Sequence, residues 1–144
     1  MKILLSALCL LTVSGFGASP AKEKEFVDAY KKAVETKSEA GLNALLYTKG
    51  SDPQALEFYK LMLADALGSK IESITLVPLT AEDKTRLANS KSPDGKVMKM
   101  VLPPVKKLVV KASKKDANGS SSATNEVYVA ESEGNLYIPV PGKN

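Results

Sequence analysis

The sequence predicts an α+β domain in which helices cover one face of an antiparallel sheet. Apolar residues recur at helical spacing up to residue 68, and from residue 71 they form short runs rich in Val, Ile and Thr. Helices that precede the strands, instead of alternating with them, are typical of α+β folds. Because the chain has 144 residues and no internal repeat, we expect a single domain over residues 22–144.

Residues 1–21 have the composition of a secretory signal peptide. Lys2 precedes an apolar run, residues 3–13, and small residues follow as far as Ala21. Ala21 is the favoured cleavage point and Ala18 is the alternative. The run is shorter than the ~20 apolar residues that span a membrane, so we expect no transmembrane segment after cleavage, with a retained N-terminal anchor as the alternative. These features predict a bacterial periplasmic or secreted protein.

The first expected helix covers residues 21–36. Its apolar side chains have the i, i+4, i+7, i+8 spacing of one helix face. The buried face is therefore expected to comprise Phe26, Tyr30, Ala33 and Val34.

A short second helix is expected over residues 38–46. Thr36 and Glu39 are three residues apart, which is the spacing of a capping box. The expected buried face is Leu42, Leu45 and Leu46, with Tyr47 at the end of the helix.

A third helix is expected over residues 53–67, after a turn that contains glycine and proline. Ser51 or Asp52 is its expected cap, Pro53 lies in its first turn, and Gly50 and Gly68 suit left-handed backbone on either side. Its apolar residues fall on one broad face, formed by Leu56, Tyr59, Leu63 and Ala66 and widened by Phe58, Met62 and Leu67.

The second half of the chain predicts about four strands. These are residues 71–79, 105–112, 126–131 and 136–140, with 96–102 as a further short candidate. Thr80 and Asp83 indicate a helical turn over residues 81–89. Residues 113–123, rich in Lys, Ser and Gly, are expected to form a polar loop. Glu133, Gly134 and Asn135 predict a tight hairpin before the last strand.

The element order and the segment Leu-Asn-Ala-Leu-Leu-Tyr, residues 42–47, resemble the nuclear-transport-factor-two-like superfamily, which includes ketosteroid isomerases. The resemblance covers residues 22–140 and includes no motif specific to the family. It implies a cone, in which three N-terminal helices pack on a curved antiparallel sheet of about four strands. Segments 73–79 and 127–138 also look like exported bacterial proteins of this type. A cystatin-like helix-on-sheet arrangement is the alternative.

Composition excludes several kinds of chemistry. Beyond residue 21 the chain has no Cys, His or Trp, which excludes a thiol nucleophile, a Ser-His-Asp triad and a zinc site with His or Cys ligands. We expect no catalytic residue, no metal ligand and no cofactor. Arg86 is the only arginine, and specific nucleic-acid recognition favours arginine, so nucleic acid is not an expected partner.

Few residues remain as candidates for function. Tyr47 and Tyr59, at a helix end and in a helix middle, are the candidate ligand-binding residues, although packing explains both. Asp65 is expected to be a solvated charge near a helix end. Five lysines gather on one strand and the loop after it, and they indicate either an edge strand protected from aggregation or a patch for an anionic partner: Lys106, Lys107, Lys111, Lys114 and Lys115.

The leading hypothesis is an exported, non-catalytic domain that binds a small apolar ligand or an envelope protein, as a monomer or homodimer. The resemblance implies a lyase or isomerase as the alternative, with acid–base chemistry in an apolar pocket. A third hypothesis is an envelope-associated structural module that uses the lysine-rich strand. A cavity of about 300 Å³ or more with converging polar groups would support the first two, and a carboxylate inside it would favour the enzyme.

Overall fold

The computed structural model describes residues 17–92 and 94–143. In these residues the helices are α1 (Pro20–Glu35), α2 (Glu39–Asn43), α3 (Pro53–Ala64) and α4 (Ala81–Ala88), and the strands are β1 (Leu46–Tyr47), β2 (Lys70–Pro78), β3 (Lys106–Asp116), β4 (Gly119–Ser132) and β5 (Asn135–Pro139). The apolar run of the expected signal peptide lies outside the described residues, so that assignment stays a prediction. No described helix is both long and apolar enough to cross a membrane.

The five strands form one open sheet in the order β1-β5-β4-β3-β2. The ladders β2–β3, β3–β4 and β4–β5 are antiparallel, whereas β1 runs parallel to β5. The predicted α+β class is therefore confirmed. The expected sheet of about four antiparallel strands is instead a mixed sheet of five, and the described helices number four instead of three.

The hydrophobic core lies between α1 and one face of the sheet, which we call the inner face. Leu108, Val110 and Val127 point from this face into the core and are buried. The predicted stripe of α1 is confirmed, because its four residues, Phe26, Tyr30, Ala33 and Val34, are each at most 4% exposed. Ser19 caps this helix and accepts a hydrogen bond from the Lys22 backbone N–H at 3.3 Å.

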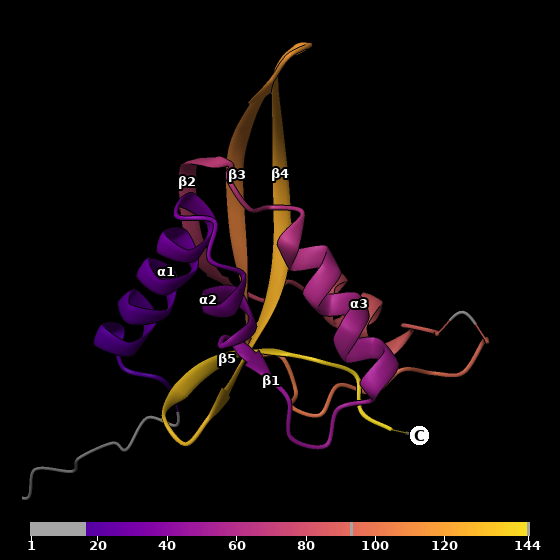
Figure 1. Ribbon diagram of the computed structural model, residues 1–144. Coiled ribbons are helices and arrows are strands. Elements are labelled where there is room, and N and C mark those ends of the chain that lie inside the picture. The colour runs from indigo at the N-terminus through magenta and orange to yellow at the C-terminus, as the bar shows by residue number, and fades with distance from the viewer. Residues whose placement is uncertain (1–16, 93, 144) are drawn as a thin grey trace, which may run out of the picture.

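The expected polar loop over residues 113–123 is wrong, because β3 and β4 continue through it as a two-stranded hairpin. The strands pair as far as Asp116 opposite Gly119, and the Asn118 backbone N–H donates to Asp116 Oδ1 at 2.7 Å. Figure 1 shows this hairpin rising beyond all the helices. Side chains on both faces of its tip are exposed to water, so the tip lacks the apolar alternation that identifies a half-buried strand.

The second helix differs from the prediction at both ends. Ser38 caps α2 by accepting from the Gly41 backbone N–H at 3.0 Å, whereas Thr36 ends α1 and its hydroxyl donates to the Lys32 carbonyl at 2.7 Å. After α2 the chain turns extended, and Leu46 pairs with Ile138 as part of β1. The predicted capping box is therefore wrong, and the end of the predicted helix is a strand.

The other predicted helix caps and turns are confirmed. Asp52 caps α3 by accepting from the Ala55 backbone N–H at 2.9 Å. Gly50 and Gly68 have positive φ values of 75° and 79°. The hairpin between β4 and β5 has positive φ at both central residues, 52° and 78°, as a type I′ turn requires.

The further short strand that was a candidate over residues 96–102 is not found. Within the described residues, this segment contributes only isolated bridges.

Candidate functional site

A hollow of about 350 Å³ lies between α3 and the inner face of β3 and β4. We call it the α3 hollow. Small side chains line much of it, and they leave unfilled the space that larger core residues would occupy. Its lining comprises Tyr30 from α1; Met62, Leu63, Asp65, Ala66 and Ser69 from α3 and the turn after it; Ala112, Ser113 and Lys114 from β3; and Ser121, Ala123, Asn125, Glu126 and Val127 from β4.

Tyr30 is the most buried polar residue of this lining. It is 2% exposed and lines the hollow, and its hydroxyl makes no hydrogen bond to a described residue. Burial raises the pKa of the Tyr30 phenol above its ordinary value, so the group stays protonated and can donate. A ligand that accepts this hydrogen bond inside the hollow would gain about 1 kcal/mol, the typical net contribution of one hydrogen bond.

Charged residues lie at the rim of the α3 hollow instead of its floor. Asp65, Lys114 and Glu126 all line it and all are exposed. The Lys114 ammonium donates to the Asp65 carbonyl at 3.3 Å and so joins the β3–β4 hairpin to the C-terminal end of α3, where a cation is favoured. As predicted, the Asp65 side chain is a solvated charge near the end of its helix.

The two tyrosines singled out from the sequence lie elsewhere, and neither lines the α3 hollow. The Tyr47 ring meets Tyr137 edge-on, with ring centroids 5.4 Å apart. The Tyr59 hydroxyl lies 4.0 Å from the sulfur of Met100. A ligand-binding role for Tyr47 or Tyr59 stays a prediction.

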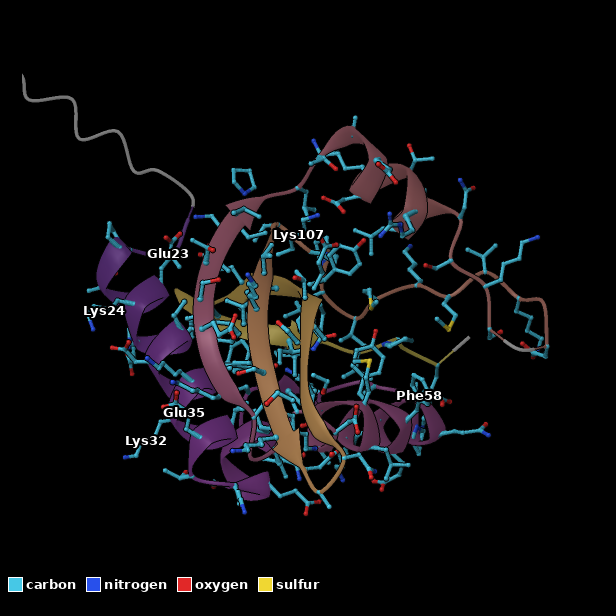
Figure 2. All side chains as sticks on the ribbon, turned by 90° about the horizontal axis from the view of Figure 1, so that it is seen from above. Glu23, Lys24, Lys32, Glu35, Phe58 and Lys107 are labelled. Carbon is cyan, nitrogen blue, oxygen red and sulfur yellow. The ribbon has the colours of Figure 1, made fainter. Side chains whose placement is uncertain are left out.

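The sequence reasoning missed Tyr30 as a site residue because it lies within the apolar stripe of α1. The sequence feature that could have identified Tyr30 is that it is the one polar side chain of that stripe. The prediction that Phe58 and Met62 widen the buried face of α3 is wrong: they are 64% and 44% exposed. Figure 2 places Phe58 on the side of the molecule away from α1. The hollow between α3 and the sheet leaves this helix only partly covered.

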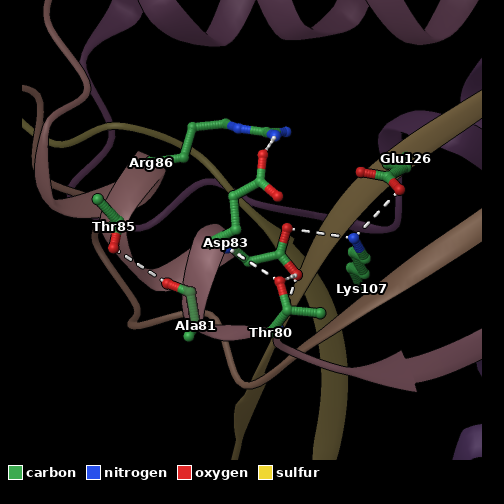
Figure 3. Close-up of polar contacts among 8 residues, drawn as sticks. Thr80, Ala81, Asp83, Thr85, Arg86, Lys107 and Glu126 are labelled. Carbon is green, nitrogen blue, oxygen red and sulfur yellow. Dashed lines mark hydrogen bonds and ion pairs between the residues drawn. The ribbon is translucent and has the colours of Figure 1, made fainter.

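A second polar cluster lies on the opposite, outer face of the sheet, beneath α4 (Figure 3). Asp83 of α4 is 2% exposed and accepts from the Thr80 backbone N–H and hydroxyl at 2.8 and 2.9 Å. These bonds belong to a capping box that starts α4 and confirm the predicted helical turn. The Lys107 ammonium contacts Asp83 and Glu126, each at 3.1 Å. Hydrogen bonds from the Thr80 backbone, then from its hydroxyl and Lys107, lower the pKa of Asp83 to about 2.

This cluster is suited to attaching α4 to the sheet. An Asp83 carboxylate that stays ionised near neutral pH and has several donors around it is a poor general base. Hydrogen bonds from Lys107 to Glu126 and Asp83 also raise the pKa of its ammonium, which keeps it charged. The buried Tyr128 hydroxyl has no hydrogen-bond partner among the described residues, and burial is the main cause of its raised pKa.

The predicted lysine cluster has a different environment from the one expected. The edge-strand interpretation is wrong, because β3 lies between β2 and β4 in the interior of the sheet. Lys106 pairs with Glu23, and Lys111 lies 3.8 Å from Glu72. With Lys107 and Lys114 also engaged, four of the five ammonium groups have intramolecular partners.

Within the described residues, no group of three or more Asp, Glu, His or Cys side chains could hold a metal ion. Comparisons of the chain with protein-family models, with curated protein sequences and with solved structures found no match.

Proposed function

We propose that this protein is a non-catalytic binding domain that takes a small amphipathic molecule in the α3 hollow. The observation that carries the proposal is the Tyr30 side chain, which belongs to a residue only 2% exposed, lines the hollow and makes no hydrogen bond to a described residue. The hollow's volume of about 350 Å³ lies at the lower end of the range for small-molecule sites, ~300–1,000 Å³.

The lining indicates the kind of ligand. Leu63, Ala112 and Val127 give a buried apolar floor around Tyr30, and polar groups surround the opening. A matching ligand has a compact apolar body with one acceptor for Tyr30, and its more polar end faces Lys114 and water. In small-molecule sites, a few polar groups on a mostly apolar wall set the orientation of the bound ligand.

The same site supports the proposed relation to nuclear-transport-factor-two-like domains. That resemblance implies a pocket between helices and the inner face of a curved sheet, which is where the α3 hollow lies. The relation, and the cone arrangement that it implies, belong to this proposal together with export to the periplasm or medium.

The two alternative functions receive less support. A lyase or isomerase needs a carboxylate with an apolar environment to act as base near neutral pH, and Asp65 and Glu126 lie at the exposed rim. An envelope module that uses free lysines is disfavoured because most of these lysines already contact acidic groups or carbonyls. Amphipathic binding is therefore the function that we put forward.

The test is a titration with two probes, followed by ¹H–¹⁵N NMR. 1-Naphthol offers a neutral apolar body with one hydroxyl, and decanoate offers an apolar chain with an anionic end. We expect at least one probe to shift the amides of Tyr30, Leu63 and Val127 at submillimolar concentration. Tyr30→Phe should weaken that binding by about 5- to 10-fold, the effect of losing one hydrogen bond of about 1 kcal/mol.

Two phenylalanine substitutions provide matched variants. Ala123→Phe fills the hollow from β4, whereas Thr124→Phe places the same ring on the next residue of that strand, which points to the outer face. Ala123→Phe should abolish binding and Thr124→Phe should leave it unchanged. This function would be excluded if both variants bound the probe equally well. It would also be excluded if neither probe shifted the amides that line the hollow.

A further inference from the structure

Among the described residues, one side of β4 has no neighbouring strand along most of its length. β5 pairs only with Ala130, Glu131 and Ser132, whereas β3 pairs with the other side of β4 down to Gly119. Residues 119–125 are all exposed, and on this side no backbone hydrogen bond joins them to another described segment. We call this row of free N–H and C=O groups the β4 edge.

The β4 edge lacks the features that protect other edges of the same sheet. β2, at one end of the sheet, carries Lys70 and Pro78 and has a register shift between Ile71 and Ser73. β1, at the other end, is only two residues long. The β4 edge has no proline, no lysine and a regular register with β3. Long, regular and unprotected edges are templates for pairing with another strand.

We propose that the β4 edge pairs antiparallel with the β4 edge of a second copy of this chain. The absence of charged residues from this segment is the reason for choosing a second copy as the partner. Residues 119–125 are Gly, Ser, Ala, Thr and Asn only, in a chain of which 25% of residues are charged. When this strand lies antiparallel to its own copy, uncharged residues face each other in every register centred on this segment, so no like charges oppose one another.

The shape of the molecule permits this pairing. The β3–β4 hairpin rises beyond the helices (Figure 1), so two hairpins can overlap side by side while the two bodies lie at opposite ends. An antiparallel pair of identical strands has two-fold symmetry, and each chain offers one such edge. The assembly therefore stops at a dimer with a continuous sheet across the interface. The β4 edge adjoins the proposed ligand site, since Ser121, Ala123 and Asn125 also line the α3 hollow. The pairing uses their backbone groups and does not depend on ligand binding.

The expected dimer is reversible. Pairing along one short strand buries less than the ~1,200 Å² of a standard stable interface, so we expect it to dissociate on dilution. Sedimentation velocity on the full chain, over about 10 μM to 1 mM, spans the weak affinities expected of such a contact. The average mass should rise from monomer towards dimer within that range and go no further.

Paired substitutions locate the interface. Ser122→Glu with Thr124→Glu puts two carboxylates on the outer face of the β4 edge, where they would lie close to the same two carboxylates of the second copy. Ser73→Glu with Thr75→Glu makes the same change at exposed positions of the same outer face on β2. The β4 variant should remain monomeric at 1 mM, and the β2 variant should associate like the unchanged chain. Circular dichroism checks that both variants are folded.

Disulfide trapping gives a second measurement that does not depend on affinity. Cys9 is the only cysteine of the chain, so Cys9→Ser provides a background for Ser122→Cys. Oxidation should link two chains through residue 122, and a Ser73→Cys control should give several-fold less product. A chain that is monomeric throughout the concentration range, equal dissociation by both glutamate pairs, or equal trapping at 73 and 122 would each overturn the proposal.

Discussion

Asp83 shows how one residue can connect local and tertiary structure. Its carboxylate closes the capping box of α4 and also contacts Lys107 on β3. Thr80 and Lys107 provide the donors that hold the pKa of Asp83 at about 2, against an ordinary value of 3.8. A single carboxylate thus starts a helix and attaches it to the outer face of the sheet.

The lowered pKa of Asp83 predicts that the free energy of unfolding decreases in acid. The pKa of this carboxylate is lower in the folded chain than in the unfolded chain, so the unfolded chain takes up a proton first as the pH falls. The stability that ionised Asp83 contributes is present above about pH 4 and is lost between about pH 4 and 2. Urea unfolding should therefore show Asp83→Asn to be less stable than the unchanged chain at pH 6, with the gap closing near pH 2.

The control for this change is Asp28→Asn. Asp28 is exposed on α1 and pairs with Lys24, so the substitution removes the same charge without breaking a buried contact. Its effect on the free energy of unfolding should be small at both pH values. Parallel stability curves for Asp83→Asn and the unchanged chain from pH 6 to 2 would contradict the role assigned to Asp83.

At the scale of the element, α1 starts before the favoured cleavage point. Its cap is Ser19 and its first residue is Pro20, so cleavage after Ala21 would remove the cap, whereas cleavage after Ala18 would keep it. A missing N-cap costs about 0.5–2 kcal/mol. The helix start therefore distinguishes the two predicted cleavage points by their expected effect on stability.

We expect a chain that starts at Ser19 to be more stable than one that starts at Lys22 by about 1 kcal/mol. Urea unfolding of the two purified chains measures this difference. Ser19→Ala in the longer chain isolates the cap from the other lost residues and should account for most of the effect. If the two chains unfold at the same urea concentration, the Ser19 hydrogen bond does not contribute to stability in solution.

Sequence patterns predicted the elements that bury one face and expose the other. The α1 stripe from Phe26 to Val34 was predicted because a helix with one covered face must repeat its apolar residues. The tip of the β3–β4 hairpin was not predicted, because a ribbon in water on both faces has no such pattern. Phe58 and Met62 were assigned to the core because periodicity identifies an apolar face but not what covers it. Tyr30 was likewise placed correctly in the core, while the hollow beside it depends on residues distant in sequence, such as Ala112 and Ala123.

For the whole molecule, burial is unevenly distributed between the two long helices. α1 has four buried side chains against the sheet, whereas α3 has one, Leu63, and shows Phe58 and Leu61 to solvent, 64% and 72% exposed. The α3 hollow also removes packing contacts from the sheet side of α3. Elements with few buried apolar contacts open locally at a lower free energy than the core.

The rates of native-state amide hydrogen exchange should therefore differ between α3 and α1. Amides in the middle of α3 should exchange at least about tenfold faster than those in the middle of α1, because α3 can detach while α1, β3 and β4 stay packed. Leu63→Ala should accelerate exchange in α3 and leave α1 almost unchanged, since it removes the anchor of a locally opening helix. Val34→Ala should accelerate both helices, because Val34 is fully buried in the shared core. Equal protection of the two helices, or equal acceleration of both by Leu63→Ala, would mean that α3 unfolds only together with the core, and the α3 hollow would then have a rigid wall.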